Sequence, residues 1–194
     1  MFHHEQLLHL SPAITRLVPG AGRRQRLNSR GAMLANQSYI RTLRATAGQR
    51  LLLMPGARLV LQRAGGEILL QLRTDFRKWG LIGGNPEPGE SLDATIRREA
   101  TEELGIRLDE LEPFGFSSNP ALETIQYPNG DRCQYFGMLF VCRSFTGQPE
   151  IADEESLKLG WFKPDALPEP LMATVQPTLS ALRVWEENGR FQML

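Results

Sequence analysis

The sequence predicts a mixed α/β (α+β) domain in which a mixed sheet is covered by helices. Three segments have the apolar spacing of amphipathic helices, and several shorter runs have the composition and bounding turns of strands. Because the two kinds do not follow a strict βαβ alternation, a mixed rather than an all-parallel sheet is expected. With 194 residues, 41% of them hydrophobic, the chain is long enough for one domain with a real core.

Helices are expected at residues 38–47, 91–104 and 174–187. Ser38 is a good N-cap for the first, and Gly48 and Gly105 stand where the first two helices need a left-handed residue to end. The apolar stripe of the second helix is Leu92, Ile96, Ala100 and Leu104, and that of the third is Val175, Leu179, Leu182 and Trp185.

Strands are expected at residues 56–62 and 67–73, joined as a hairpin by Ala64-Gly65-Gly66. Further strands are expected at residues 108–116, 122–127, 132–143 and 158–162. Cys133 and Cys142 lack the spacing of metal ligands, so we expect two buried free thiols in a reducing compartment.

The first 37 residues are expected to form a flexible basic N-terminal extension outside a domain that covers residues 38–194. This tract is rich in Pro, Gly, Ser, Asn and Arg without a sustained period, although a short helix near residues 5–10 is an option. The alternative is that the tract does not belong to the working protein and that Met33 is the true start.

The net charge is zero, with 22 basic and 22 acidic residues, which argues against a protein built for bulk binding to nucleic acid. Residues 1–50 nevertheless hold eight arginines and one acid, so they carry +7 and leave contact with RNA open. Apolar runs such as 51–54 are far shorter than the roughly 18 to 20 residues of a membrane span. The polar start does not resemble a secretion signal, so a cytoplasmic protein is expected.

Three glutamates share one face of the helix expected at residues 91–104. Glu99, Glu102 and Glu103 fall within an arc of about 100° beside the apolar stripe. Like charges at these spacings each cost a helix roughly 0.2 to 0.5 kcal/mol. A solvated acidic face is one explanation; the other is that a hard cation such as Mg²⁺ or Mn²⁺ binds these oxygens.

The spacing around these glutamates favours the second explanation. The fixed positions are Gly84, Glu90, Arg98, Glu99, an apolar Ala100, Glu102, Glu103, Gly105 and an apolar Ile106. They are every fixed position of the Nudix box, so the chain resembles the Nudix hydrolase family. Weaker similarity extends over about 155 residues, including Trp79-Gly80 before the box and Gly160-Trp161-Phe162 after it.

The resemblance implies an α/β/α sandwich and a Mg²⁺-dependent (or Mn²⁺-dependent) hydrolase. Its substrate would be a nucleoside diphosphate linked to another moiety, such as a nucleoside triphosphate or ADP-ribose, and a homodimer is possible. The implied metal ligands are Glu99, Glu102, Glu103, Gly83 and Glu90. Arg98 would orient the glutamates, and the base that activates water would be Glu102 or Glu155, with Glu154 as a neighbouring candidate.

Candidates for substrate binding follow from position and chemistry. Arg73 and Arg77 lie where they could meet phosphates, and Tyr135 could stack on a base. The alternative function is a catalytically silent Nudix-fold module that binds a nucleotide or regulates a partner. Loss of a box glutamate would mark such a module, and the box is intact.

Overall fold

The computed structural model describes residues 39–194. The predicted extension, its short helix, the alternative start at Met33 and the Ser38 cap all lie outside the described residues. The helices are α2 (Tyr39–Ala47), α3 (Leu92–Leu104), α4 (Pro120–Glu123) and α5 (Val175–Asn188). The strands are β1 (Leu52–Leu61), β2 (Ile68–Arg73), β3 (Trp79–Gly80), β4 (Ile82–Gly84), β5 (Arg107–Ser117), β6 (Thr124–Gln126), β7 (Arg132–Thr146), β8 (Ser156–Phe162) and β9 (Gln192–Met193).

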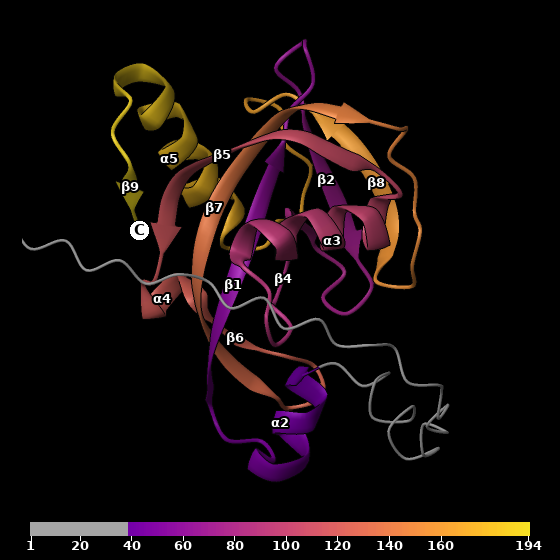
Figure 1. Ribbon diagram of the computed structural model, residues 1–194, viewed down its shortest axis with the longest axis vertical. Coiled ribbons are helices and arrows are strands. Elements are labelled where there is room, and N and C mark those ends of the chain that lie inside the picture. Colours follow the sequence, from indigo (N-terminus) through magenta and orange to yellow (C-terminus); the bar gives the residue numbers. More distant parts are fainter. Residues whose placement is uncertain (1–38) are drawn as a thin grey trace, which may run out of the picture. The chain divides into compact units, whose positions relative to one another are not determined.

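Two sheets form the body of the domain (Figure 1). The larger has the order β4-β1-β7-β5-β9, with β6 paired to β7, and the smaller has the order β3-β2-β8. β1 runs parallel to β7 from Leu52–Cys133 to Leu61–Cys142, whereas β4 and β5 add antiparallel strands on either side of this pair. The larger sheet is therefore mixed, as predicted.

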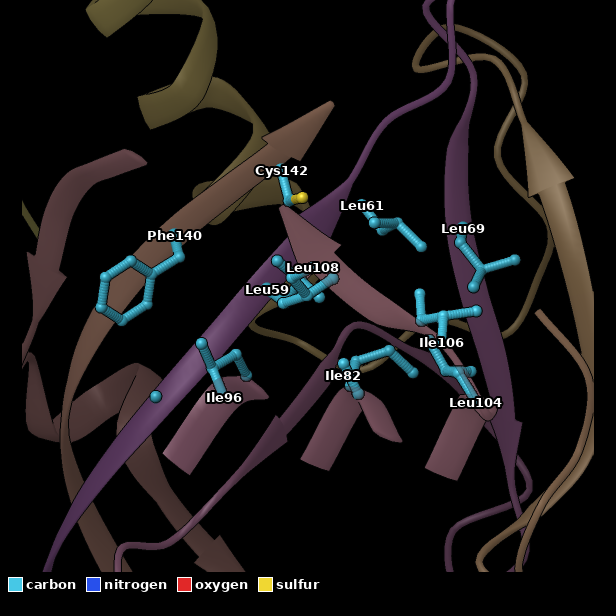
Figure 2. Packing of buried hydrophobic residues seen from close by; sticks show 12 residues of the cluster. Leu59, Leu61, Leu69, Ile82, Ile96, Leu104, Ile106, Leu108, Phe140 and Cys142 are labelled. Atoms are coloured by element: carbon cyan, nitrogen blue, oxygen red, sulfur yellow. The ribbon is translucent and has the colours of Figure 1, made fainter. Parts of the chain in front are cut away.

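Alternating side chains of β1 face the two helices that cover the larger sheet. Ala57, Leu59 and Leu61 belong to a buried cluster with Ile96, Ala100 and Leu104 of α3 (Figure 2). Val60 belongs to a second buried cluster, with residues of β7 and of α5. Successive residues of a strand point to opposite faces, so α3 and α5 cover opposite faces of the sheet and make the predicted sandwich.

Two strand predictions need correction. Residues 63–67 do turn as a hairpin would, but β1 and β2 meet only at a single bridge, between Gln62 and Ile68, and then enter different sheets. β2 pairs with β8 instead, about 90 residues later in the sequence. The turn chemistry predicted the reversal of the chain correctly, but the sheet that each strand joins depends on distant partners.

The second correction concerns residues 122–127, which were expected to be one strand. The segment opens as α4, because Asn119 accepts a hydrogen bond from the Ala121 amide and Pro120 occupies the first turn. Only Thr124–Gln126 form a strand, β6. Because Glu123 lies in this short helix, its side chain points in a direction that a strand at the same position would not give it.

Cys133 and Cys142 are free and buried, as expected. None of the helices within residues 39–194 has the length and apolarity that a membrane crossing needs. Gly105 ends α3 with φ of 67°, and its amide donates to the carbonyls of Ala100 and Thr101. That conformation favours glycine, because a Cβ costs roughly 1 to 2 kcal/mol in the left-handed region.

Replacing Gly105 with alanine is expected to lower the free energy of unfolding by about 1 kcal/mol. The added Cβ would meet nothing closer than 3.9 Å, so the cost comes from the backbone conformation alone. Urea unfolding measures it. Gly65→Ala is the matched control, because Gly65 lies outside the left-handed region; an equal loss in both variants would contradict the explanation.

Candidate active site

A cavity of about 900 Å³ opens beside α3 and joins most of the predicted site residues. It is lined by segments of β1, β4, α3, β7 and the loops before β3 and β8. The predicted site residues that line it are Arg73, Gly83, Arg98, Glu99, Glu102, Tyr135 and Glu155. Glu90, Glu103 and Arg77 do not.

The helix that carries the glutamates is fixed at both ends and along its apolar side. The hydroxyl of Ser91 caps its start by accepting from the Ala94 amide at 3.1 Å, and Gly105 closes its end. Ile96, Ala100 and Leu104 are fully buried against the sheet. The polar side chains of α3 are therefore carried on a rigid support.

Arg98 connects the acidic side chains to the loop before the helix. Its Nε and Nη2 donate to the two oxygens of Glu90 at 2.8 and 3.1 Å. Its Nη1 donates to Glu99 and Glu102, both at 2.9 Å, and Nη2 also donates to the Asn85 carbonyl at 3.0 Å. These five bonds match the five N–H groups of a guanidinium, so every donor of Arg98 is engaged and its side chain is held in one orientation.

Glu90 is held as tightly as Arg98. Besides Arg98, the Glu87 amide and the Thr95 hydroxyl donate to its carboxylate. The hydrogen bond from Arg98 is the main reason that the pKa of Glu90 falls to about 2. Its oxygens are therefore occupied by hydrogen bonds that stabilise the loop between β4 and α3.

Glu99 lies directly against the paired glycines of β4. A Cβ on Gly84 would sit 2.0 Å from the carboxylate oxygen Oε1 of Glu99, and a Cβ on Gly83 would sit 2.6 Å from the carbonyl oxygen of Ala57. Neither position has room for a side chain, but the obstacles differ, since one is a carboxylate and the other is backbone. The glycine pair lets β4 approach both the helix and β1.

Glu103 is the most deeply buried of the glutamates on α3, with only 2% of its surface exposed. Its oxygen Oε2 is buried and has no hydrogen-bond partner among residues 39–194. The pKa of Glu103 is raised to about 9, chiefly by burial and in smaller part by the nearby charges of Glu99, Glu155 and Asp153. A buried carboxyl that lacks a protein partner suits a site completed by a proton or by a cation.

The loop before β8 brings Glu155 to the same cluster. The amide of Ala152 donates to the Glu103 carbonyl at 3.1 Å, and the amide of Thr74 donates to the Glu155 carbonyl at 2.9 Å. The loop is thus tied both to the end of α3 and to the loop after β2. Glu155 is open to water in the cavity, yet partial desolvation raises the pKa of its carboxyl, and the charge of Arg73 opposes that rise.

The chemistry of this donor set fits a divalent cation. Burial also raises the pKa of Glu99, with Arg98 opposing it, so the carboxylates of Glu99 and Glu103 are both destabilised as anions. A bound cation would reverse that effect. Within residues 39–194, no three acidic, histidine or cysteine side chains converge into a complete ligand set. Water and phosphate oxygens would supply the remaining ligands, which is the usual situation for Mg²⁺.

The predicted substrate-binding residues have separate placements. Arg73 makes a bidentate ion pair with Asp75, at 2.9 and 2.7 Å, at the cavity wall. The hydroxyl of Tyr135 lies 2.6 Å from that of Tyr127, and burial is the main cause that raises its pKa. Arg77 is exposed in the loop after β2 with φ of 54° and is not one of the residues that line the cavity.

A second charged pair lines the cavity, formed by Arg58 of β1 and Glu123 of α4, and neither residue was predicted from the sequence. The one signal in the sequence is a charged residue inside an otherwise apolar strand, between Ala57 and Leu59. The position of its partner depends on the short helix α4, which was expected to be a strand. The pair could therefore not be found from spacing along the chain.

Comparison with known proteins agrees with this geometry. A family model described as a NUDIX domain matches residues 52–182, more than half of the chain. The nucleoside triphosphatase NudI of Escherichia coli O1:K1 / APEC is 31% identical over 114 residues, which cover 56% of this chain and 80% of NudI.

The comparison with solved structures also finds Nudix hydrolases. The crystal structure of a MutT Nudix hydrolase from Burkholderia pseudomallei has 27% identity and a TM-score of 0.55, covering 67% of this chain and 98% of that one. An ADP-ribose pyrophosphatase from Streptococcus suis, at 16% identity, TM-score 0.53, and coverage of 72% and 97%, shares the fold alone. The class of protein defined by the fold and site is a pyrophosphohydrolase enzyme. The chain belongs to the Nudix hydrolase family.

Gly84→Ala is expected to reduce hydrolysis by about 100-fold, because its Cβ would displace the Glu99 carboxylate by an ångström or more. The unfolding temperature of Gly84→Ala should fall less than that of Gly83→Ala. The Cβ in Gly83→Ala would collide with the backbone of Ala57, which can yield less than a side chain can. The comparison of turnover and unfolding temperature in both variants tests this. Wild-type turnover in Gly84→Ala would contradict it.

The buried carboxyl of Glu103 is expected to make the metal-free protein less stable as pH rises. Its pKa is about 9 in the folded chain and ordinarily 4.5, so between these values the folded state holds a proton that the unfolded state lacks. The free energy of unfolding should therefore fall across this window. Urea unfolding in EDTA measures it against Glu103→Gln, in which the fall should be smaller; identical slopes would be the contrary result.

Proposed function

We propose that this protein is a Mg²⁺-dependent hydrolase that cleaves the pyrophosphate bond of a nucleoside triphosphate. The observation that carries the proposal is the cluster of carboxylates on α3, in which Glu103 is buried and its Oε2 has no partner in the part of the chain that the structure describes. Water would add to a phosphorus atom and the bridging P–O bond would break, which gives a nucleoside monophosphate and pyrophosphate. Phosphoryl chemistry of this kind needs positioning and neutralisation of charge more than covalent participation by the protein.

The cation would be held by Glu99 and Glu103, with Glu102 and the carbonyl of Gly83 as further ligands. When bound, Mg²⁺ or Mn²⁺ supplies neutralisation of charge on the phosphate oxygens. Arg98 keeps Glu99 and Glu102 at the cavity wall through its two bonds from Nη1. The three partners of Glu90 favour support of the loop as its role, because its oxygens are already occupied.

We assign the role of general base to Glu155. Its carboxyl lines the cavity, and its raised pKa brings it closer to the range in which a base can take a proton from water. Glu102, the other candidate, is 58% exposed and accepts a hydrogen bond from Arg98. Glu154 also lines the cavity and provides a matched control.

The substrate class rests on the relatives and on the size of the cavity. NudI, at 31% identity, is a nucleoside triphosphatase, and the Burkholderia pseudomallei structure is of a MutT hydrolase. A cavity of about 900 Å³ lies within the range of pockets that enclose nucleotide-sized ligands. The similarity to an ADP-ribose pyrophosphatase is one of fold alone, so nucleoside triphosphates are the first substrates to test.

A cytoplasmic location is also proposed, and the free thiols of Cys133 and Cys142 support it, because reducing compartments keep cysteines unpaired. The homodimer, contact with RNA and the domain limits of 38–194 stay predictions.

Glu103→Gln is expected to lower hydrolysis of nucleoside triphosphates by about 1,000-fold or more while the fold survives, because an amide cannot supply the anionic oxygen that the cation needs. Ion chromatography of the products, with Mg²⁺ and with EDTA, tests the reaction and its metal dependence together. A wild-type enzyme that hydrolyses no nucleoside triphosphate, or a fully active Glu103→Gln variant, would refute the proposed function.

The assignment of the base is tested by pH–rate profiles of Glu155→Gln, Glu102→Gln and Glu154→Gln. Glu155→Gln should lose at least about 100-fold in kcat and lose the rise of rate that accompanies deprotonation of the base. Glu154→Gln should keep both. If Glu102→Gln removes that limb of the profile and Glu155→Gln does not, the base is Glu102.

A further inference from the structure

The charged pair that the sequence analysis missed is built differently from the acidic cluster. Arg58 of β1 donates from Nη1 and Nη2 to the two oxygens of Glu123 at 3.1 and 2.9 Å. The Ser117 hydroxyl also donates to Glu123, and Nη1 of Arg58 donates to the Thr178 hydroxyl of α5 at 3.2 Å. Both members line the cavity, on the α5 face of the sheet, whereas Glu99 is carried by α3.

Stability alone is a weak reason for this pair. Glu123 is 2% exposed and Arg58 17%, and burying two charges costs about as much as their attraction returns. Replacement by well-packed apolar residues is often neutral or stabilising in such cases. A pair that lines a substrate cavity has a second possible use, namely recognition of the substrate.

The geometry of the pair leaves one edge of the arginine for a ligand. Within residues 39–194, the hydrogen bonds of Arg58 use three of its five N–H groups. The other two, Nε–H and the second proton of Nη2, form a separate edge with two parallel donors. Glu123 holds the guanidinium from its far end and so fixes the direction of that edge.

The charge of the pair indicates which part of a nucleotide it meets. Arg58 and Glu123 together are neutral, so they attract a phosphate much less than a lone arginine would. The carboxylates of α3 are at the other face of the sheet, where a cation and the phosphates are expected under the proposed function. The sugar and the base of a nucleoside triphosphate are both neutral and both carry hydrogen-bond acceptors. Only the base holds two acceptors side by side in one plane, which is the arrangement that two parallel donors match.

We propose that Arg58 reads the base of the substrate and that Glu123 positions Arg58, an inference that rests on the proposed function. Two parallel donors match two adjacent acceptors, which guanine offers at O6 and N7 and cytosine at O2 and N3. Adenine places an amino donor beside N7, and uracil places N3–H between its carbonyls. The site therefore selects guanine or cytosine over adenine and uracil.

The test is steady-state hydrolysis of GTP, CTP, ATP and UTP by the full-length enzyme and its variants. The wild type should have a kcat/KM for GTP or CTP about tenfold or more above those for ATP and UTP. Arg58→Gln should lose that preference. Arg143→Gln, which removes an arginine paired with Glu112 and Glu186 outside the cavity, should keep it. Glu123→Gln should weaken the preference chiefly through KM.

Two further measurements separate recognition of the base from general damage. Inhibition by inorganic tripolyphosphate, which has no base, should be unchanged in Arg58→Gln. If GTP is preferred, 7-deaza-GTP lacks one acceptor, so it should be a poorer substrate for the wild type and no worse than GTP for Arg58→Gln. If CTP is preferred, the ratio of CTP to UTP gives the same comparison.

The outcomes distinguish this inference from the proposed function. Failure of the wild type on all four nucleotides would overturn both. Hydrolysis without a preference for guanine or cytosine, or a preference that persists in Arg58→Gln, would overturn the role of Arg58 alone. If Arg58→Gln does not fold, Arg58→Lys keeps the charge beside Glu123 but lacks the two-donor edge, and it must show the same loss of preference.

Discussion

The arrangement of charged side chains in this enzyme depends on the free-energy cost of holding several carboxylates together at the edge of a hydrophobic core. Arg98 offsets that cost for Glu90, Glu99 and Glu102 with four of its five hydrogen bonds and fixes the loop carbonyl of Asn85 with the fifth. It makes no hydrogen bond to Glu103, which is buried with one oxygen unpartnered by any of the described residues. The protein thus carries a locally unfavourable charge distribution, and α3 can carry it because its apolar side is fully packed.

The rest of the fold serves this arrangement by bringing distant segments to one cavity. The paired glycines of β4 let the helix approach, and the loop before β8 is tied to the end of α3, so Glu155 joins the cluster from far along the chain. The neutral pair of Arg58 and Glu123 occupies the opposite face of the same sheet. One cavity therefore combines an acidic part, suited to a cation and phosphates, with a neutral polar part, suited to a base.

The sequence predicted the features that depend on local spacing. The α3 helix, its buried stripe and its cap at Gly105 agree with the structure, because helical periodicity and a left-handed glycine act within a few residues. The separate sheets of β1 and β2 were missed because pairing with distant strands decides them. The short helix α4 was missed although its Asn-Pro start is a local signal, because four residues are too few to show a helical period. The near-complete burial of Glu103 and its partnerless oxygen also depend on packing across the fold, which no spacing within the box contains.

The central claim is that the carboxylates of α3 form a cation site. Titration of the metal-free enzyme with Mn²⁺, followed by electron paramagnetic resonance of the free ion, tests it without any substrate. Binding should weaken by about tenfold or more in Glu103→Gln and stay at the wild-type value in Glu110→Gln, which alters an exposed glutamate of β5. Equal Mn²⁺ affinity in the wild type and Glu103→Gln would contradict the claim.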